Sequence, residues 1–282
     1  MGTVGSYTGG GGKDGDDLRQ GLTDWLDSLT ADPSADGEGG GEMPGDGDQN
    51  PVDSNPTPDR PHLDPNALLS AIALLRPRQH SGAKSDGPGA GGGSGTSGGS
   101  GSRGSGGASR SAAASAGTAG RAAAGALAFA TGDSETLARL GLDYDALLAL
   151  EDNFEVVREI VDSAFEAAPP DSTIPDHERR LVAADIAEWV IEESAAGHTP
   201  APEDIVRRTI AAIIAQATLA ETGDLAGHHV NGALSEEEVR EAAEVLASQA
   251  ELSIDGATEN EFAQAVEEGI ETLRAIKEAA GE

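Results

Sequence analysis

The sequence predicts an all-α protein, in which a C-terminal multi-helix bundle follows a long, largely disordered N-terminal region rich in Gly, Ser and Asp. From about residue 122 onward, apolar residues recur at helical spacing, and no run alternates with period two for long enough to form a convincing strand. Hydrophobic residues make up 37% of the 282 residues and aromatic residues 3%. Both fractions are low for a chain that is compact throughout, so part of it is expected to be unfolded.

These features divide the chain into six segments. They are a flexible N-terminal tail (1–17), a short amphipathic helix (18–29), an acidic disordered linker (30–63), a second short helix (64–76), a Gly/Ser-rich basic linker (77–121) and an all-α helical domain (122–282). A segment of about 150 residues is long enough to bury an independent core. The predicted architecture is therefore one folded domain preceded by two short helices.

The first predicted helix carries a single apolar stripe. Its members, at helical spacing, are Leu18, Leu22, Trp25, Leu26 and Leu29. Asp16 or Asp17 can act as its N-cap. A short helix between disordered flanks is not stable alone in water. It either docks on the C-terminal domain or binds a partner, which makes Leu22, Trp25 and Leu26 candidate partner-docking residues.

The second short helix leads into a basic island. Asp64 is its predicted N-cap, and Pro65 is its first helical residue. From Arg76 to Arg121 the chain contains six basic residues and one acid, Asp86. Because the charges are dispersed and lack interleaved aromatic residues, they are a weak signal for nucleic-acid binding. We expect a tether that lies on the protein's own acidic surface.

Direct nucleic-acid binding is the less favoured interpretation of the basic island. It would use Arg103, Arg110 and Arg121 on the phosphates, and it predicts retention on DNA that is lost as salt rises.

The helical domain contains several amphipathic helices with recognisable ends. Their expected buried stripes are Leu150, Phe154, Val157, Val161 and Phe165; Val182, Ile186, Trp189 and Val190; Val206, Ile210, Ile213 and Ala217; Val239, Ala243 and Leu246; and Phe262, Val266, Ile270 and Leu273. Thr199 is the predicted N-cap of the third of these helices. Capping boxes of Ser235 with Glu238 and of Thr258 with Glu261 open the last two.

The chain is strongly acidic, because 50 Asp and Glu against 18 Lys and Arg give a net charge of −32. This charge disfavours nonspecific contact with DNA or an anionic membrane. Only three of the basic residues are lysines. That composition is typical of proteins from a high-salt cytoplasm, as in a halophile, and an acidic protein of a GC-rich bacterium is the alternative. With no cysteine, no membrane-spanning run and no signal-peptide pattern, we expect a soluble cytoplasmic protein.

No catalytic, cofactor-binding or metal site is predicted. Gly10, Gly12 and Gly15 match a dinucleotide-binding pattern, but no strand precedes them, so flexible glycine is the better interpretation. The start of a calcium-binding loop at Asp46 has Pro51 in place of the required turn glycine. Nothing suggests an activated nucleophile, so we expect a protein that is not an enzyme and needs no cofactor.

The first residues, "MGTVGSYTGGGG", contain one candidate modification site, Gly2. Methionine aminopeptidases accept its small side chain, so removal of Met1 leaves Gly2 as a free α-amine, whose ordinary pKa keeps a useful fraction neutral and nucleophilic. Residues 3–15 hold this amine away from the core, so that it can enter another protein's active site. The start also meets the N-myristoylation pattern, with Ser6 at the hydroxyl position. A single acyl chain beside so many acids would bind an anionic membrane poorly.

Several stretches occur in a distinctive order along most of the chain. They are "MGTVGSYTGG", "DWLD", a basic Gly/Ser/Ala-rich stretch, "GRAAAGALAFATG", "LARLGLDYDALLAL", "IPDHERRLVAADIAEWVIEE" and "IVRRTIAAIIAQATLAETGD". This series resembles the QatB family, the B components of the four-gene Qat anti-phage defence systems. Two features depart from the family: Trp25 follows "GLTD" instead of a Pro-rich "P-x-x-P-x-W" approach, and the middle segment has fewer arginines and aromatic residues.

The resemblance implies a non-enzymatic defence component with three partners. These are an ATPase, a TatD-like nuclease and a protein resembling the QueC-type enzymes of 7-deazaguanine synthesis. It implies that the QueC-like protein couples a deazaguanine base to Gly2, with Thr3 to Gly12 as the strand that enters its active site. The alternative is a general helical scaffold or protein-interaction module with a docking N-terminal arm.

Overall fold

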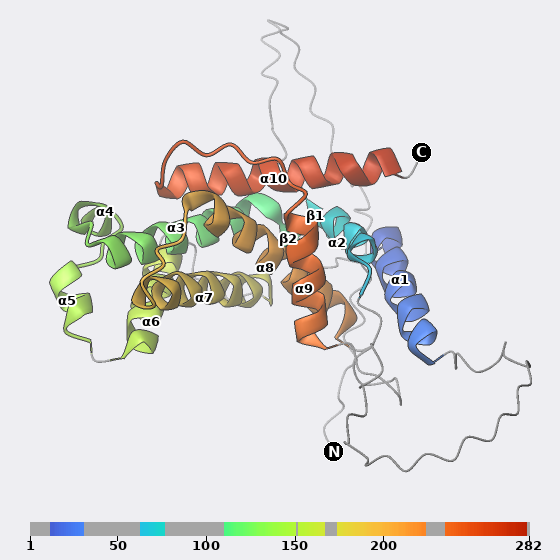
Figure 1. Cartoon of the computed structure of the whole chain (residues 1–282), viewed down its shortest axis with the longest axis horizontal. Helices are drawn as coiled ribbons and strands as arrows, with labels where there is room; N and C mark the ends of the chain where they lie inside the picture. Colours follow the sequence, from blue (N-terminus) through green and yellow to red (C-terminus); the bar gives the residue numbers. More distant parts are fainter. Residues whose placement is uncertain are drawn as a thin grey trace, which may run out of the picture.

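The computed structural model describes residues 12–30, 63–76, 110–150, 152–166, 174–223 and 235–280. In these residues the chain forms an elongated all-helical body, which confirms the predicted fold class (Figure 1). The only extended pairing within the described ranges is a parallel contact between two-residue strands, β1 (Leu75–Arg76) and β2 (Arg110–Ser111).

Helix α3 (Ala112–Thr131) forms the centre of the body, between α7 (Ile174–Ala195) and α10 (Glu259–Ala280). The buried residues of α3 are mostly alanine, so neighbouring helices can approach closely. The closest approach is at Gly120, where an added Cβ would lie 2.9 Å from the backbone of Ala263. Glycine is therefore required where α3 meets α10.

The remaining helices of the bundle surround these three. Helix α6 (Asn153–Glu166) packs against α3 and α7, and α4 (Ser134–Arg139) and α5 (Tyr144–Leu148) lie at one end of the long axis (Figure 1). Helix α8 (Pro202–Thr222) contacts α7, α10 and α9 (Glu236–Ala247). These contacts enclose one continuous core.

The N-terminal elements close the opposite end of the body. They are α1 (Gly12–Thr30), the 3-10 helix η2 (Pro65–Leu68) and α2 (Leu69–Leu74). Leu18 and Ile72 are fully buried, and both belong to the same core as the bundle. The first short helix therefore docks on the rest of the chain, which was one of its two predicted alternatives.

The predicted boundary between the flexible tail and the first helix is wrong. Helix α1 begins at Gly12, so Asp16 and Asp17 lie inside the helix rather than at its N-cap. Tertiary contacts explain the earlier start. Lys277 of α10 pairs with Asp14 at 3.3 Å, and Gly15 lies directly against the side chain of Glu221. These contacts offset the poor helix propensity of the two glycines in this turn.

The predicted start of the folded domain at residue 122 is also too late. Helix α3 begins at Ala112, with Ser111 as a side-chain N-cap that accepts from the Ala114 N–H at 3.3 Å. The last ten residues of the predicted basic linker are therefore helical. Ala112, Ala116 and Ala119 are buried at helical spacing, because this Ala/Gly/Ser stretch forms the tight contact with α10. Likewise, the second short helix is η2 followed by α2 and ends at Leu74.

Most local predictions in the bundle are confirmed. Both capping boxes are present, at Ser235 and at Thr258. Two details are wrong. Phe154 is 68% exposed, because the buried face of α6 is formed instead by Val156, Val157, Ile160, Val161 and Ala164. Helix α8 begins at Pro202 with Ala201 as its N-cap, not at Thr199.

Candidate functional site

Of the functional residues predicted in the N-terminal region, the structure describes those of α1 and not Gly2. Gly2 lies outside the described residues. Leu22, Trp25 and Leu26 lie on the inner face of α1, with 0%, 8% and 2% of their surface exposed. Helix α1 packs there against α2, η2 and α8. The protein's own core covers these three residues in this structure, so they are not exposed for docking on a partner.

Polar contacts help to hold α1 on the body, and we call the following two the α1 anchor. In the first, Arg19 Nε lies 3.5 Å from Glu221 Oε1, and Arg19 Nη2 donates to the backbone oxygen of Glu221 at 2.9 Å. In the second, Lys277 Nζ donates to Asp14 Oδ1 at 3.3 Å. Glu221 is 5% exposed, so the first contact is largely shielded from water. The α1 anchor thus fixes the first turns of α1 to both α8 and α10.

The α1 anchor also limits how far Gly2 can lie from the body. Ten backbone steps separate Gly2 from Gly12. Because a fully extended chain advances at most about 3.6 Å per residue, the Gly2 amine stays within about 36 Å of the start of α1.

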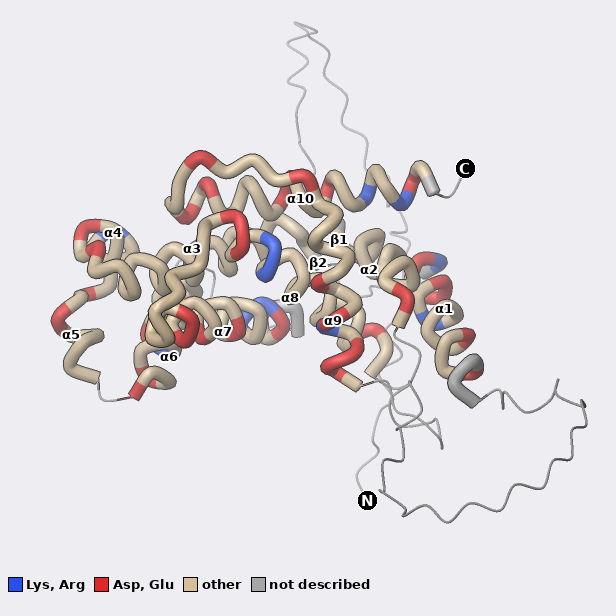
Figure 2. Tube along the Cα trace, in the orientation of Figure 1, with Lys and Arg blue, Asp and Glu red and all other residues tan. Residues whose placement is uncertain are grey.

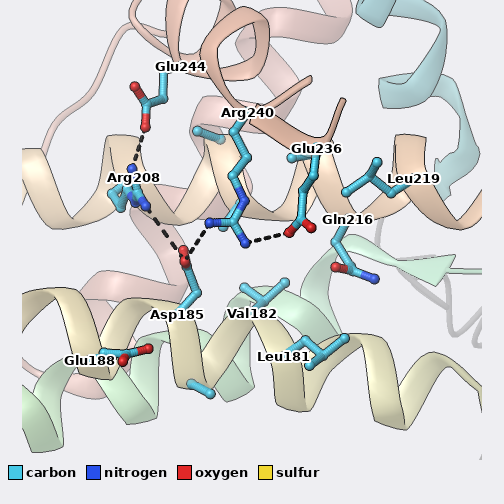
Figure 3. A pocket seen from close by; sticks show the side chains of 14 residues that line it. Leu181, Val182, Asp185, Glu188, Arg208, Gln216, Leu219, Glu236, Arg240 and Glu244 are labelled. Atoms are coloured by element: carbon cyan, nitrogen blue, oxygen red, sulfur yellow. Dashed lines mark hydrogen bonds and ion pairs between the residues drawn. The ribbon is translucent and has the colours of Figure 1, made fainter. Parts of the chain in front are cut away.

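A second candidate site, the α7–α8–α9 groove, is a surface pocket of about 300 Å³ between these three helices (Figure 3). Ala211, Ala212 and Ala215 of α8 form part of its lining. Leu181 of α7 and Leu219 of α8 add larger apolar side chains, and Leu181 is 44% exposed. The groove therefore offers an open apolar surface bordered by charged residues.

Charged residues from all three helices meet within this groove, where their contacts bridge α7 to α8 and α9 (Figure 3). Asp185 of α7 pairs with Arg208 of α8 at 3.6 Å and with Arg240 of α9 at 3.5 Å. Arg240 also donates to Glu236 at 2.7 Å, and Arg208 pairs with Glu244. This network joins α9 to the bundle, and both guanidinium groups in it already have carboxylate partners.

Among the charged residues of the described chain, acids outnumber Lys and Arg (Figure 2). On α9, acids occupy the exposed face beside the groove, with Arg240 as the basic residue among them. They are Glu236, Glu237, Glu241 and Glu244. This surface favours cationic ligands over anionic ones.

The basic residues considered for nucleic-acid binding do not form a described patch. Arg121 lies within α3 and pairs with Glu259 of α10 at 3.5 Å. Arg103 lies outside the described residues, and Arg110 is in β2. Arg121 is therefore committed to holding two helices together.

The residues whose pKa values are shifted in the structure lie at the ends of helices. The Thr136 side chain donates to Asp133, and the Thr258 side chain donates to Glu261, which lowers the pKa of both carboxyl groups. Burial lowers the pKa of Arg179, which pairs with Asp176 in the first turn of α7. All three interactions lie at the N-terminal ends of helices, namely α4, α10 and α7.

The described part of the chain contains no group of three or more His, Asp or Glu residues placed to bind a metal ion. Among the described helices, none combines the length and the apolar character needed to cross a membrane. A scan against protein-family models found no match, and neither did searches of curated proteins and of solved structures.

The groove was not predicted from the sequence. Asp185, Arg208 and Arg240 lie on three different helices, and none of them stands in a motif. A local signal does exist on α8, where Ala211, Ala212 and Ala215 lie beside the predicted buried stripe. Of these three, Ala212 is half-buried, so α8 presents a small, partly exposed residue where the groove lies.

Proposed function

We propose that this protein is a non-enzymatic adaptor of a QatB-like anti-phage defence system. In this proposal, removal of Met1 exposes the Gly2 α-amine, and a QueC-like partner modifies it with a deazaguanine-type base. The observation that supports the proposal is the α1 anchor. It fixes the first turns of α1 to the helical body, and nine residues separate the start of this helix at Gly12 from Gly2.

The physical advantage of such an arrangement is a high local concentration of the amine. A modifying enzyme that binds the body finds Gly2 confined within about 36 Å of α1. Linkers of this length give effective concentrations in the millimolar range. Modification then depends on recognition of the folded body as well as of the N-terminal sequence, which makes the reaction selective for this protein.

In the same proposal, the helical body recruits further proteins in the cytoplasm. The resemblance to QatB implies an ATPase and a TatD-like nuclease as further partners. The acidic face of α9 and the α7–α8–α9 groove provide binding surface for such proteins. The helical body supplies no chemistry of its own in this scheme.

Intact mass measurement tests the modification directly. The protein is purified after expression with its neighbouring genes, and we expect loss of Met1 and a mass increase on Gly2. Gly2→Leu should retain Met1 and stay unmodified, whereas the matched control Gly5→Leu should keep the added mass. An unmodified Gly2 beside an active QueC-like protein would contradict the proposal.

Deletion of residues 2–11 separates this function from that of a general scaffold. Helix α1 and its anchor stay intact in the deletion, so the protein should remain folded by circular dichroism. A modification substrate should lose all protection against phage, whereas a general scaffold should keep it. A replacement of residues 3–11 with a Gly/Ser sequence of equal length controls for spacing.

A further inference from the structure

We propose that the α7–α8–α9 groove is a docking site for a basic amphipathic helix of a partner protein. This inference is independent of Gly2, because it depends on residues of three bundle helices and not on the N-terminal region. It follows from the apolar lining of the groove, its size and the charge of its border.

The apolar lining supplies the contact area. Ala211 and Ala215 are only 3% exposed and add little area, but the half-buried Ala212 presents only a methyl group, so a second helix can come close to α8 there. Leu181 is 44% exposed on one side of the groove, and Leu219 is half-buried. An apolar side chain placed between these two leucines would remove them from water, which is favourable.

The volume of the groove sets the size of what it can hold. About 300 Å³ is at the lower end of the range for binding pockets, which suits one or two aliphatic side chains better than a large ligand. A helix that presents leucines at positions i, i+3 or i+4, and i+7 places such anchors in a row.

The charge of the border determines which helix fits. Four carboxylates and two guanidinium groups line the groove itself, which gives it a net charge of −2. They are Asp185, Glu188, Glu236 and Glu244, with Arg208 and Arg240. Glu237 and Glu241 on the adjoining face of α9 add two more negative charges to the border. Since Arg208 and Arg240 are both paired with carboxylates of the border, an acidic partner would meet net repulsion. Lys or Arg flanking the apolar anchors would instead meet complementary charge.

A synthetic peptide provides the test. The probe is a fluorescein-labelled 18-residue helical peptide with Leu along one face and Lys on the other, titrated with the full-length protein and followed by fluorescence anisotropy. We expect saturable binding. A peptide of the same composition in scrambled order, and one with Glu in place of Lys, should bind at least tenfold more weakly. Absence of binding, or equal binding of either control peptide, would overturn the proposal.

Variants of the protein locate the binding site. Leu181→Asp removes the exposed apolar wall, and we expect it to weaken binding of the Leu/Lys peptide by about tenfold to a hundredfold. Phe154→Asp is the matched control, because Phe154 is an exposed apolar residue of α6 outside the groove. It should change the affinity less than twofold. Equal effects of the two variants would show that the groove is not the site.

Two further variants test the size and charge of the groove separately. Ala212→Leu fills the groove from α8 and should weaken binding although it makes the surface more apolar. Glu237→Lys reverses one charge of the border, and Glu271→Lys makes the same change on the exposed face of α10. We expect Glu237→Lys to weaken binding of the Leu/Lys peptide severalfold more than Glu271→Lys does. Unchanged affinity in Ala212→Leu, or equal loss in both charge variants, would contradict the assignment. Thermal melts by circular dichroism confirm that each variant is folded.

Discussion

Arg19 and Glu221 join the first and the eighth α-helix across 202 residues of sequence, through a hydrogen bond from Arg19 Nη2 to the backbone oxygen of Glu221 and an ion pair of 3.5 Å. Glu221 is 5% exposed, whereas Arg19 is 26% exposed. Burying a charged group is costly unless a partner of opposite charge accompanies it, and Arg19 is such a partner for Glu221. The contact therefore determines how firmly α1 stays on the body.

Loss of this carboxylate should loosen α1. We expect Glu221→Gln to lower the free energy of unfolding by about 2 kcal/mol, because the Arg19 guanidinium loses its charged partner in a largely buried contact. In a Trp189→Phe background, Trp25 of α1 is the remaining tryptophan, and its fluorescence in a urea titration reports the release of the helix. Glu203→Gln is the control, since the exposed Glu203–Arg207 pair should contribute less than about 1 kcal/mol. Equal losses in both variants would argue against the α1 anchor.

The burial of Leu22 predicts a large effect on the stability of the isolated protein. Leu22 is 0% exposed, so Leu22→Ala should cost about 3 kcal/mol through lost apolar contact and an unfilled cavity. Leu148 is 55% exposed, and Leu148→Ala should change stability by less than about 0.5 kcal/mol. Chemical denaturation without any partner measures both. If Leu22→Ala had no effect there, Leu22 would have to be exposed in the free protein.

Two glycines of α3 should respond in opposite directions to alanine. At Gly117 an added Cβ meets nothing within 4 Å, so Gly117→Ala should stabilise the protein by about 1 kcal/mol through helix propensity. At Gly120 the same Cβ would lie 2.9 Å from the backbone of α10, so Gly120→Ala should destabilise it by about 2 kcal/mol. Differential scanning calorimetry compares the two melting temperatures. A rise in both would mean that α3 and α10 do not approach this closely.

The capping box of α10 should make part of the stability depend on pH. The hydroxyl and the backbone N–H of Thr258 donate to Glu261 at 2.6 and 3.0 Å, and these bonds lower the pKa of its carboxyl group. Because this pKa is lower in the folded protein than in the unfolded one, the stabilisation is complete above the unfolded pKa. It is lost as the pH falls through the folded pKa.

We therefore expect Glu261→Gln to lower the urea midpoint at neutral pH and to matter progressively less toward about pH 3. Urea titrations at both pH values measure this difference. Glu271→Gln, on the exposed face of the same helix, serves as the control and should show a smaller change with pH. A Glu261→Gln effect that stayed constant with pH would exclude an ionised Glu261 as its source.

Features encoded within one helix could be predicted from the sequence. The capping box of Ser235 with Glu238 and the buried stripe of Phe262, Val266, Ile270 and Leu273 depend on residues three or four positions apart, and the structure confirms them. Local spacing is sufficient in these cases because the interacting groups lie on adjacent turns.

Features that depend on distant partners could not be predicted in this way. The first turn of α1 contains Gly12 and Gly15, and its contacts come from Glu221 and from Lys277, which lies 263 residues after Asp14. The start of α3 has the Ala, Gly and Ser composition of a linker, and its contact with α10 makes it helical. The α7–α8–α9 groove likewise exists only after three separate helices have assembled.

The position of α1 has a consequence for synthesis on the ribosome. This helix leaves the exit tunnel early, but Glu221 is made 202 residues after Arg19, a delay of about 10 to 40 seconds at ordinary translation rates. Helix α2 follows much sooner and can cover part of the apolar face in the meantime. Until α8 emerges, the leucines of α1 are incompletely shielded, so the nascent chain should be a substrate for chaperones that bind exposed leucine-rich helices.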